Sequence, residues 1–170
     1  MARAKTAPFQ IRFETGITSG SQTITTPDLS MYVDPVNRQA LLVTEVDYIW
    51  TDSSNYMPIL FAGNDGSAAV QIHDSNLGGM FSLTDSHQVS SGSIFYETNG
   101  VLTNTLDFFP DTMGRALGGR IIVNDSLEVV SLGAGTIPAN SICTVVMECE
   151  VVKLSEKDYI ALALQTVADN

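Results

Sequence analysis

"SICTVVMECEVVKL", residues 141–154, predicts one long β-strand, because apolar residues alternate along its whole length. The residues of one parity are all apolar and predict a row that faces the core, namely Cys143, Val145, Met147, Cys149 and Val151. The opposite row is also largely apolar, but Glu148 and Glu150 interrupt it. Those two carboxylates must therefore face water, a cation or another protein chain.

A second long strand is predicted for "QALLVTEVDYIWT", residues 39–51. Its odd-numbered residues, among them Glu45 and Asp47, are expected to face away from the core. The expected core-facing set is the even-numbered one, namely Leu42, Thr44, Val46, Tyr48 and Trp50. Shorter alternating stretches at 8–15 and 21–26 predict two further strands.

Three turn signals predict hairpins between the two long strands. Asn99-Gly100 is the strongest, since Asn-Gly supplies the positive φ that a two-residue type I′ turn requires. Asp65-Gly66 and Asn124-Asp125 are the other two. Between the hairpins at Asn99-Gly100 and Asn124-Asp125, Asp111 is expected to cap a short helical turn, and Gly118 and Gly119 are expected to end it.

The C-terminal segment predicts a helix. Ser155, with Asp158 three residues later, approximates a capping box. One face at helical spacing is formed by Tyr159, Leu162, Ala163, Thr166 and Val167. The helix is either a lid over one end of the domain or an arm that docks on a neighbouring subunit.

The pattern of eight to ten strands, without βαβ alternation or internal repeats, predicts an all-β fold. A long strand near each end with shorter hairpins between them is typical of an antiparallel two-sheet sandwich of the jelly-roll type. The 170 residues fit a single domain. We expect an N-terminal arm at 1–8, the sandwich at 9–154 and a C-terminal helix or arm at 155–170.

The composition argues against nucleic acid and membranes as extensive partners. The net charge is −11, and three of the eight basic residues, Arg3, Lys5 and Arg12, lie in the first twelve positions. Such an acidic body is unsuited to wrapping a polyanion. No stretch is apolar and long enough to span a membrane, and the N-terminus lacks the apolar run of a secretory signal.

Low charge also fits a surface that is partly buried against other chains. Charged residues are 16% of the chain, against roughly 25% in soluble domains. Interface cores are depleted in charge. A polar surface rich in hydroxyl groups explains the same numbers equally well.

Cys143 and Cys149 are expected to be buried free thiols. They lie six residues apart on one strand, which separates them by roughly 20 Å. A disulfide needs Cα atoms within about 7 Å, so the two cannot pair, and the same distance excludes a shared metal. This fits folding in a reducing compartment.

Four carboxylates form the candidate metal site. Glu45 and Asp47 share a face of the early strand, and Glu148 and Glu150 share a face of the late one. Neighbouring placement of the two strands would gather all four. Like charges directly opposed in a sheet are unfavourable, so the group faces bulk water, a cation such as Ca²⁺, or a subunit contact. A glycosidase pair would require a cleft, which the sequence does not indicate.

The sequence predicts no enzyme and no cofactor. His73 and His87 lie in unrelated contexts without an His-x-His pattern, and both are expected at surface or turn positions. There is no GxSxG, no P-loop and no GxGxxG, and neither cysteine has a plausible base beside it.

Aromatic residues surround the polar turn in "DYIWTDSSNY", residues 47–56. Tyr48 and Trp50 have the inward parity and are expected in the core. Exposed aromatics beside Asp52 or Asn55 are also what a sugar-binding site uses, with Trp50 and Tyr56 as the stacking surfaces.

In layout, residues 9–154 resemble the small single jelly-roll coat proteins of icosahedral viruses. The resemblance rests on "QALLVTEVDYIW", "SICTVVMECEVVKL" and the hairpins between them. It implies a self-assembling shell subunit of the virion, built in the host cytoplasm. Its partners would be copies of itself and a second capsid protein, and Ca²⁺ would bridge carboxylates at subunit contacts.

One departure from that family concerns the genome. Coat proteins that package single-stranded genomes often carry long basic arms, and this chain has only Arg3, Lys5 and Arg12. Little direct nucleic-acid contact is therefore expected, because another protein or an internal membrane would separate the shell from the genome. The alternative function is a carbohydrate- or receptor-binding sandwich, such as a lectin-like or viral spike domain.

Overall fold

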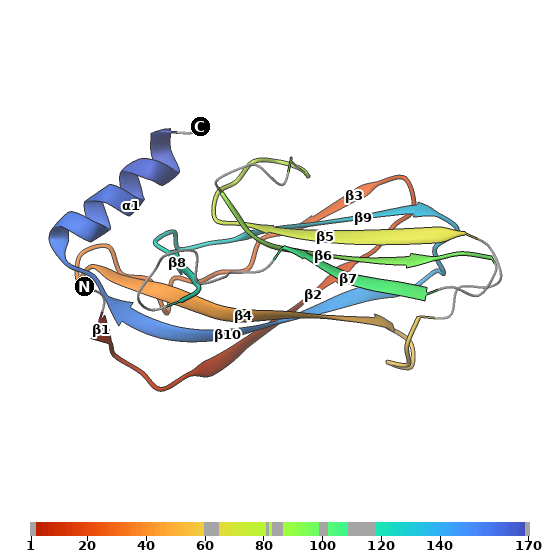
Figure 1. Ribbon diagram of the computed structural model, residues 1–170, viewed down its shortest axis with the longest axis horizontal. Helices are drawn as coiled ribbons and strands as arrows, with labels where there is room; N and C mark the ends of the chain where they lie inside the picture. Colours follow the sequence, from red (N-terminus) through yellow and green to blue (C-terminus); the bar gives the residue numbers. More distant parts are fainter. Residues whose placement is uncertain are drawn as a thin grey trace.

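The computed structural model describes residues 3–59, 65–80, 82, 87–98, 102–108 and 118–168. Within these residues the chain forms ten strands and one C-terminal helix, as predicted (Figure 1). The elements are β1 (Arg3–Ala4), β2 (Phe9–Gly16), β3 (Gln22–Thr25), β4 (Gln39–Asp52), β5 (Gly66–His73), β6 (Gln88–Tyr96), β7 (Leu102–Phe108), β8 (Arg120–Ile122), β9 (Glu128–Gly135), β10 (Ser141–Lys153) and α1 (Glu156–Ala168).

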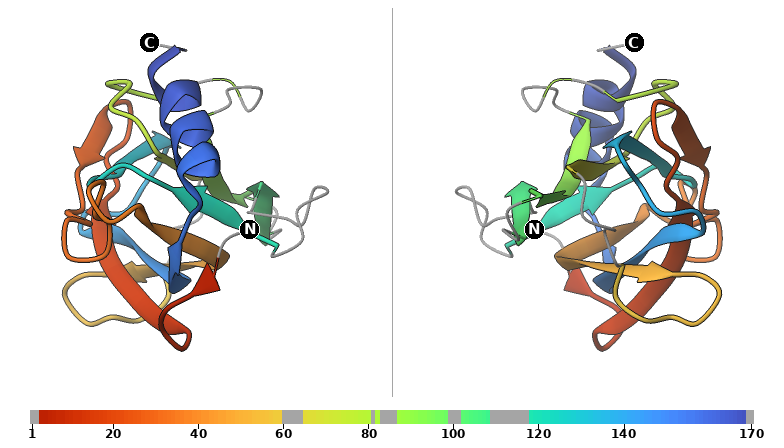
Figure 2. Two further views of the ribbon diagram at one scale, coloured as in Figure 1. Left: turned by 90° about the vertical axis from the view of Figure 1, so that its left-hand side faces the viewer. Right: turned by 90° about the vertical axis from the view of Figure 1, so that its right-hand side faces the viewer.

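The strands form two five-stranded antiparallel sheets that pack face to face (Figures 1 and 2). In the first sheet β10 lies between β4 and β2, β8 follows β4, and β1 continues the edge that β2 forms. In the second sheet the order is β3-β9-β5-β6-β7. The all-β sandwich is confirmed, and the order β2-β10-β4-β8 facing β3-β9-β5-β6 is compatible with a jelly roll.

The main core lies between the sheets. Every predicted core residue of β10 from Cys143 to Cys149 is buried there. Tyr48 and Trp50 of β4 join the same core, as expected, and the Tyr48 hydroxyl donates a hydrogen bond to Ser90 Oγ at 2.8 Å. In these parts of β4 and β10, the apolar residues that alternate in the sequence are therefore the residues that the two sheets bury.

The predicted alternation of β4 is wrong before Glu45, because the strand contains a β-bulge. Glu148 pairs with Glu45, but the next residue of β10, Cys149, pairs with Val43. Thr44 is the extra residue, and its hydroxyl donates to the Glu148 carbonyl at 3.2 Å. A bulge reverses the inward parity. Beyond it Leu41 and Val43 enter the main core, whereas Leu42, expected to face inward, lies on the outer face.

The apolar outer surface beyond the bulge carries α1. Ala40, Leu42, Val123, Val152 and Leu154 form a second buried cluster. The helix covers this cluster with three side chains of its predicted face, namely Tyr159, Leu162 and Ala163. The predicted cap is also present, since Ser155 Oγ accepts a hydrogen bond from the Asp158 amide at 3.2 Å. The helix lies at the same end of the sandwich as β1, which pairs with the last residues of β10 (Figures 1 and 2).

Two of the three predicted hairpins are wrong. Among the described residues β5 pairs only with β6 and β9, so Asp65-Gly66 does not join β5 to the segment before it. Asn124-Asp125 links β8 to β9, which belong to different sheets. The third prediction is confirmed in its pairing, since β6 and β7 are antiparallel neighbours. Its Asn99-Gly100 turn and the turn predicted from Asp111 lie outside the described residues.

Both cysteines are buried free thiols, as predicted. Burial raises the pKa of Cys143 and the pKa of Cys149 to about 12. No helix in the described part of the chain is long and apolar enough to cross a membrane.

Gly92 of β6 leaves room for the buried ring of Tyr48. A Cβ at Gly92 would lie 2.6 Å from Tyr48 Cδ2, so the ring would have to move within a packed core. We expect Gly92→Ala to lower the free energy of unfolding by about 1–3 kcal/mol in urea titrations. Gly16→Ala is the control, because a Cβ there meets nothing within 4 Å. Equal effects of the two substitutions would contradict the packing explanation.

Candidate functional site

The four predicted carboxylates share the outer face of the first sheet. Glu45 of β4 is directly opposite Glu148 of β10, and Asp47 is opposite Val146 in the adjacent row. Glu150 lies beyond the bulge, opposite Leu42. The structure thus brings the two acidic pairs onto neighbouring strands, as the sequence suggested, and places two like charges face to face.

The cation nearest to this group in register is Arg12 of β2. Arg12 is opposite Val146, in the row that contains Asp47. Its guanidinium donates to Gln10 Oε1 at 2.7 Å. In the described residues, no group of three or more His, Cys, Asp or Glu side chains is arranged to hold a metal ion. A cation held between subunits would take part of its ligands from a second chain, so the site at a subunit contact stays a prediction.

The expectation for the histidines is wrong for His73, which is buried at the end of β5, whereas His87 lies at a turn, as expected, although its side chain is buried too. His73 lies between Glu128 and Gln88 in a row that crosses β9, β5 and β6 on the outer face of the second sheet. All three side chains of this row are buried. The three residues of the row come from strands far apart in the sequence, so no sequence motif predicts that they lie together.

The segment at 74–80 closes over this row. Both oxygens of the Glu128 carboxylate accept the Gly78 amide at 3.0 Å. His73 Nδ1 lies 3.7 Å from Glu128 Oε1. A buried carboxylate that accepts backbone hydrogen bonds fixes the segment on the sheet. His73 and Glu128 are thus closed off from solvent, and Glu128 holds the loop at Gly78.

A partly buried ion pair supports the same loop. Arg120 Nη2 donates to Asp74 Oδ2 at 2.6 Å, and Asn124 Nδ2 donates to the Asp74 carbonyl. Burial raises the pKa of Asp74, and the charge of Arg120 opposes that rise. Within the described part of the chain, Asp74 Oδ1, Ser75 Oγ and the Gln88 amide have no hydrogen-bond partner. Such buried polar atoms are usually satisfied by ordered water.

Of the two aromatic rings considered for sugar stacking, only Tyr56 is exposed. Trp50 is 6% exposed and belongs to the core. Tyr56 is exposed, but the polar groups around it serve the turn itself. Asp52 Oδ1 accepts hydrogen bonds from the Ser54 amide and hydroxyl, and Asn55 Oδ1 accepts one from the Met57 amide.

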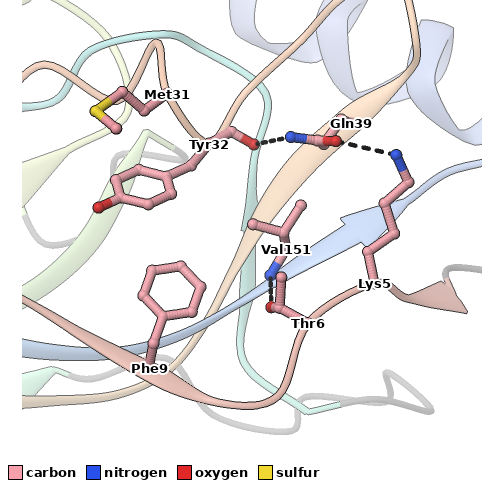
Figure 3. A pocket seen from close by; sticks show the side chains of 7 residues that line it. All are labelled: Lys5, Thr6, Phe9, Met31, Tyr32, Gln39 and Val151. Atoms are coloured by element: carbon pink, nitrogen blue, oxygen red, sulfur yellow. Dashed lines mark hydrogen bonds between the residues drawn. The ribbon is translucent and has the colours of Figure 1, made fainter.

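An open pocket of about 480 Å³ lies at the end of the sandwich where β1 pairs with β10 (Figure 3). Its apolar walls are Phe9, Met31, Tyr32 and Val151, and its polar rim is Lys5, Thr6 and Gln39. The Phe9 and Tyr32 rings stack with centroids 5.1 Å apart.

Hydrogen bonds hold the rim of this pocket in place. Lys5 Nζ donates to Gln39 Oε1 at 3.0 Å, and Gln39 Nε2 donates to the Tyr32 carbonyl at 3.0 Å. Sequence reasoning missed the pocket because its residues come from four separate segments. Met31-Tyr32 gave no signal of its own, because the same loop also contains the apolar residues Leu29, Val33 and Val36.

Removal of Arg120 is expected to expose the cost of burying Asp74. Arg120→Met removes the cation that is hydrogen-bonded to that carboxylate and leaves only the weaker electrostatic effect of His87, so the free energy of unfolding should fall by about 3 kcal/mol at neutral pH. Arg38→Met is the control, because the Arg38–Glu156 pair is exposed and contributes about 0–1 kcal/mol.

The effect of Arg120→Met should depend on pH. Because the pKa of Asp74 is raised in the folded chain, protonation there contributes stability that is present at acid pH and is lost as the pH rises through the folded-state pKa. Loss of Arg120 raises that pKa further. Urea titrations should therefore find the variant closest to wild type near pH 4 and furthest below it near pH 7. A deficit that does not change with pH would contradict this account.

The facing pair Glu45–Glu148 should cost stability in the isolated chain. Glu148→Gln removes one of two opposed charges and is expected to raise the free energy of unfolding by a few tenths of a kcal/mol at low salt. The gain should shrink at high salt, where exposed charges are screened. Glu14→Gln, opposite Thr144, is the control. A loss of stability on Glu148→Gln would show that another group already compensates the pair.

Comparisons with other proteins give no match: no family model matches the chain, and no curated protein matches it either. Its function is therefore inferred from the strand order, the surface charges and the exposed apolar side chains.

Proposed function

We propose that this protein is a structural subunit that assembles with copies of itself into a closed shell, as the coat protein of an icosahedral virus does. The observation that carries the proposal is the strand order, because β2-β10-β4-β8 facing β3-β9-β5-β6 is compatible with a jelly roll. Jelly rolls occur in viral coats, in lectins and in cupins. The fold alone does not distinguish these three functions, so the argument for one of them has to come from the surface residues.

Surface residues favour assembly over the other two uses of the fold. Lectin-like binding through Trp50 is disfavoured because that ring is buried in the core. A cupin-type metal site finds no ligand group among the described residues. Large apolar side chains are instead exposed at both ends of the sandwich. Met31, Val36 and Leu164 lie at the α1 end, and Tyr56 and Met57 follow the far end of β4. Methionine and aromatic residues are enriched in protein–protein interfaces.

The charge distribution fits a shell that touches its genome little. The body of the chain is acidic, and its outer β4–β10 face carries Glu45, Asp47 and Glu148. Such a face repels a polyanion. In the proposed virion, a second capsid protein or an internal membrane stands between this shell and the genome. A divalent cation at a subunit boundary would compensate the acidic face.

Light scattering and negative-stain imaging of the purified protein test the proposal. The expected result is uniform rings or particles far above the chain mass of 18.3 kDa. If a cation bridges the acidic face between subunits, a chelator should dissociate the particles, and Glu45→Gln with Glu148→Gln should remove the sensitivity to chelator. A monomer at all salt concentrations and pH values would overturn the proposal, and sugar binding at Tyr56 would then be the function to test.

A further inference from the structure

Strand β2 is an edge of the first sheet, and its backbone is paired on one side. It is eight residues long and, among the described strands, pairs with β10 alone, without a bulge, from Phe9–Cys149 to Gly16–Ile142 (Figure 1). The opposite edge strand of the same sheet, β8, has three residues. Proteins shorten, bulge or cover edge strands that must not pair with another chain. An edge as long and regular as β2 is therefore able to accept a partner strand.

Alternate residues of β2 direct their backbone N–H and C=O groups away from β10. The Ile17 amide, just beyond β2, donates to the carbonyl of Ser141, the residue opposite it when the register of the pair is continued. In an antiparallel pair, residues bonded to the residue opposite them alternate with residues whose backbone groups point to the other side. The even-numbered Gln10, Arg12 and Glu14 therefore point outward, and no strand of the described chain lies beyond them.

The side chains of β2 alternate as well. Ile11 and Phe13 are half-buried at the border of the main core. Arg12 and Glu14 are exposed on the outer face and carry opposite charges two residues apart. Arg12 donates to the neutral side chain of Gln10 at 2.7 Å, and in the described part of the chain neither Arg12 nor Glu14 belongs to an ion pair. The edge thus carries one free charge of each sign.

These two charges favour one register for the pairing of β2 with β2 of a second copy. A two-fold axis at Phe13 places Arg12 opposite Glu14 of the second copy and Glu14 opposite Arg12 of the second copy. An axis at Arg12 or at Glu14 would instead place two like charges directly opposite each other, which is unfavourable. Among the registers that bring the outward backbone groups of both strands together, the one centred on Phe13 alone forms opposite-charge pairs.

We propose that β2 pairs antiparallel with β2 of a second copy about a two-fold axis at Phe13, which joins the first sheets of two copies into one continuous sheet. The inference rests on the proposed function and names a contact through which the shell subunits associate. Addition of a strand to an exposed sheet edge is a recurrent recognition mode. The two Phe13 residues then form a non-hydrogen-bonded pair, with Cα atoms about 4.5 Å apart. Aromatic pairs across antiparallel strands stabilise a sheet.

This contact is isologous, because both copies use the same edge. Each copy has one β2 edge, so the pairing ends at a dimer. A shell would therefore be built from such dimers through other surfaces, and the dimer and the shell can be tested separately.

Cysteine cross-linking tests the contact and its register. Phe13→Cys places two introduced thiols opposite each other across the axis, so oxidation in air should give covalent dimers on a non-reducing gel. Ile11→Cys is the matched control, because it changes a half-buried side chain on the same face of the same strand. Its two copies would lie four residues apart along the strands, roughly 13 Å, and a disulfide needs Cα atoms within about 7 Å. The native Cys143 and Cys149 are buried in both variants.

Charge reversal tests the same contact without changing the core. Arg12→Glu and Glu14→Arg each place like charges opposite each other at two positions, so sedimentation velocity should find dimerisation weakened by about 10-fold or more. Both substitutions in one chain restore two opposite-charge pairs, and so does an equal mixture of the two single variants. The double variant and the mixture should therefore dimerise like wild type.

Lys153→Glu and Asp125→Arg are the controls for the change of charge. Lys153 is exposed and lies eight residues along β10 from Val145, the residue opposite Phe13, or roughly 26 Å away. Asp125 is exposed in the link between β8 and β9. Both variants should dimerise like wild type.

The outcomes separate this contact from the shell. No covalent dimer from Phe13→Cys, or an equal yield from Ile11→Cys, would overturn the contact. Failure of the double variant to recover dimerisation would overturn it as well. Particles that still assemble in either case would leave the shell proposal standing. Dimers that cross-link at Phe13→Cys but never form larger particles would overturn the shell and support the contact.

Discussion

The pairing of β4 with β10 is the constraint on which the rest of the structure depends. It runs without a gap in the sheet from Ser141–Asp52 to Lys153–Gln39, and its one irregularity is the bulge at Thr44. Before the bulge the outer face of the pair is acidic, and beyond it the outer face is apolar enough to seat a helix. One extra residue therefore allows a single strand pair to serve the core, an acidic face and a helix-binding face.

The two sheets offer contrasting outer faces. The first carries Glu14, Glu45 and Asp47 in neighbouring rows, with Arg12 beside them, whereas the described outer side chains of β5 and β6 around Ala69, Ser93 and Phe95 are uncharged. The charged end of the second sheet, at Glu128, is sealed beneath the segment at 74–80. The net charge of the chain is thus unevenly displayed, which limits the orientations in which two copies can approach.

Sequence alternation predicted the elements well because it reports burial, as Cys143, Met147 and Tyr48 illustrate. It failed at Leu42, because the bulge at Thr44 reverses which residues of β4 face inward and no sequence pattern marks the position of a bulge. It also failed at Asn124-Asp125, because the same turn residues serve a hairpin and a crossing between sheets. The acidic face was foreseeable because each pair lies within one strand. The His73 row and the pocket were not, because their members meet only through tertiary structure.

The position of the two thiols has a kinetic consequence. Cys143 and Cys149 are fully buried at the centre of the sandwich, and a pKa of about 12 keeps them protonated at any physiological pH. Only a thiolate reacts readily with an alkylating agent or an oxidant. Modification therefore has to wait until β10 separates from a neighbouring layer. The rate at which an alkylating agent modifies the two cysteines therefore reports how often the sandwich opens, and no cysteine has to be introduced for that measurement.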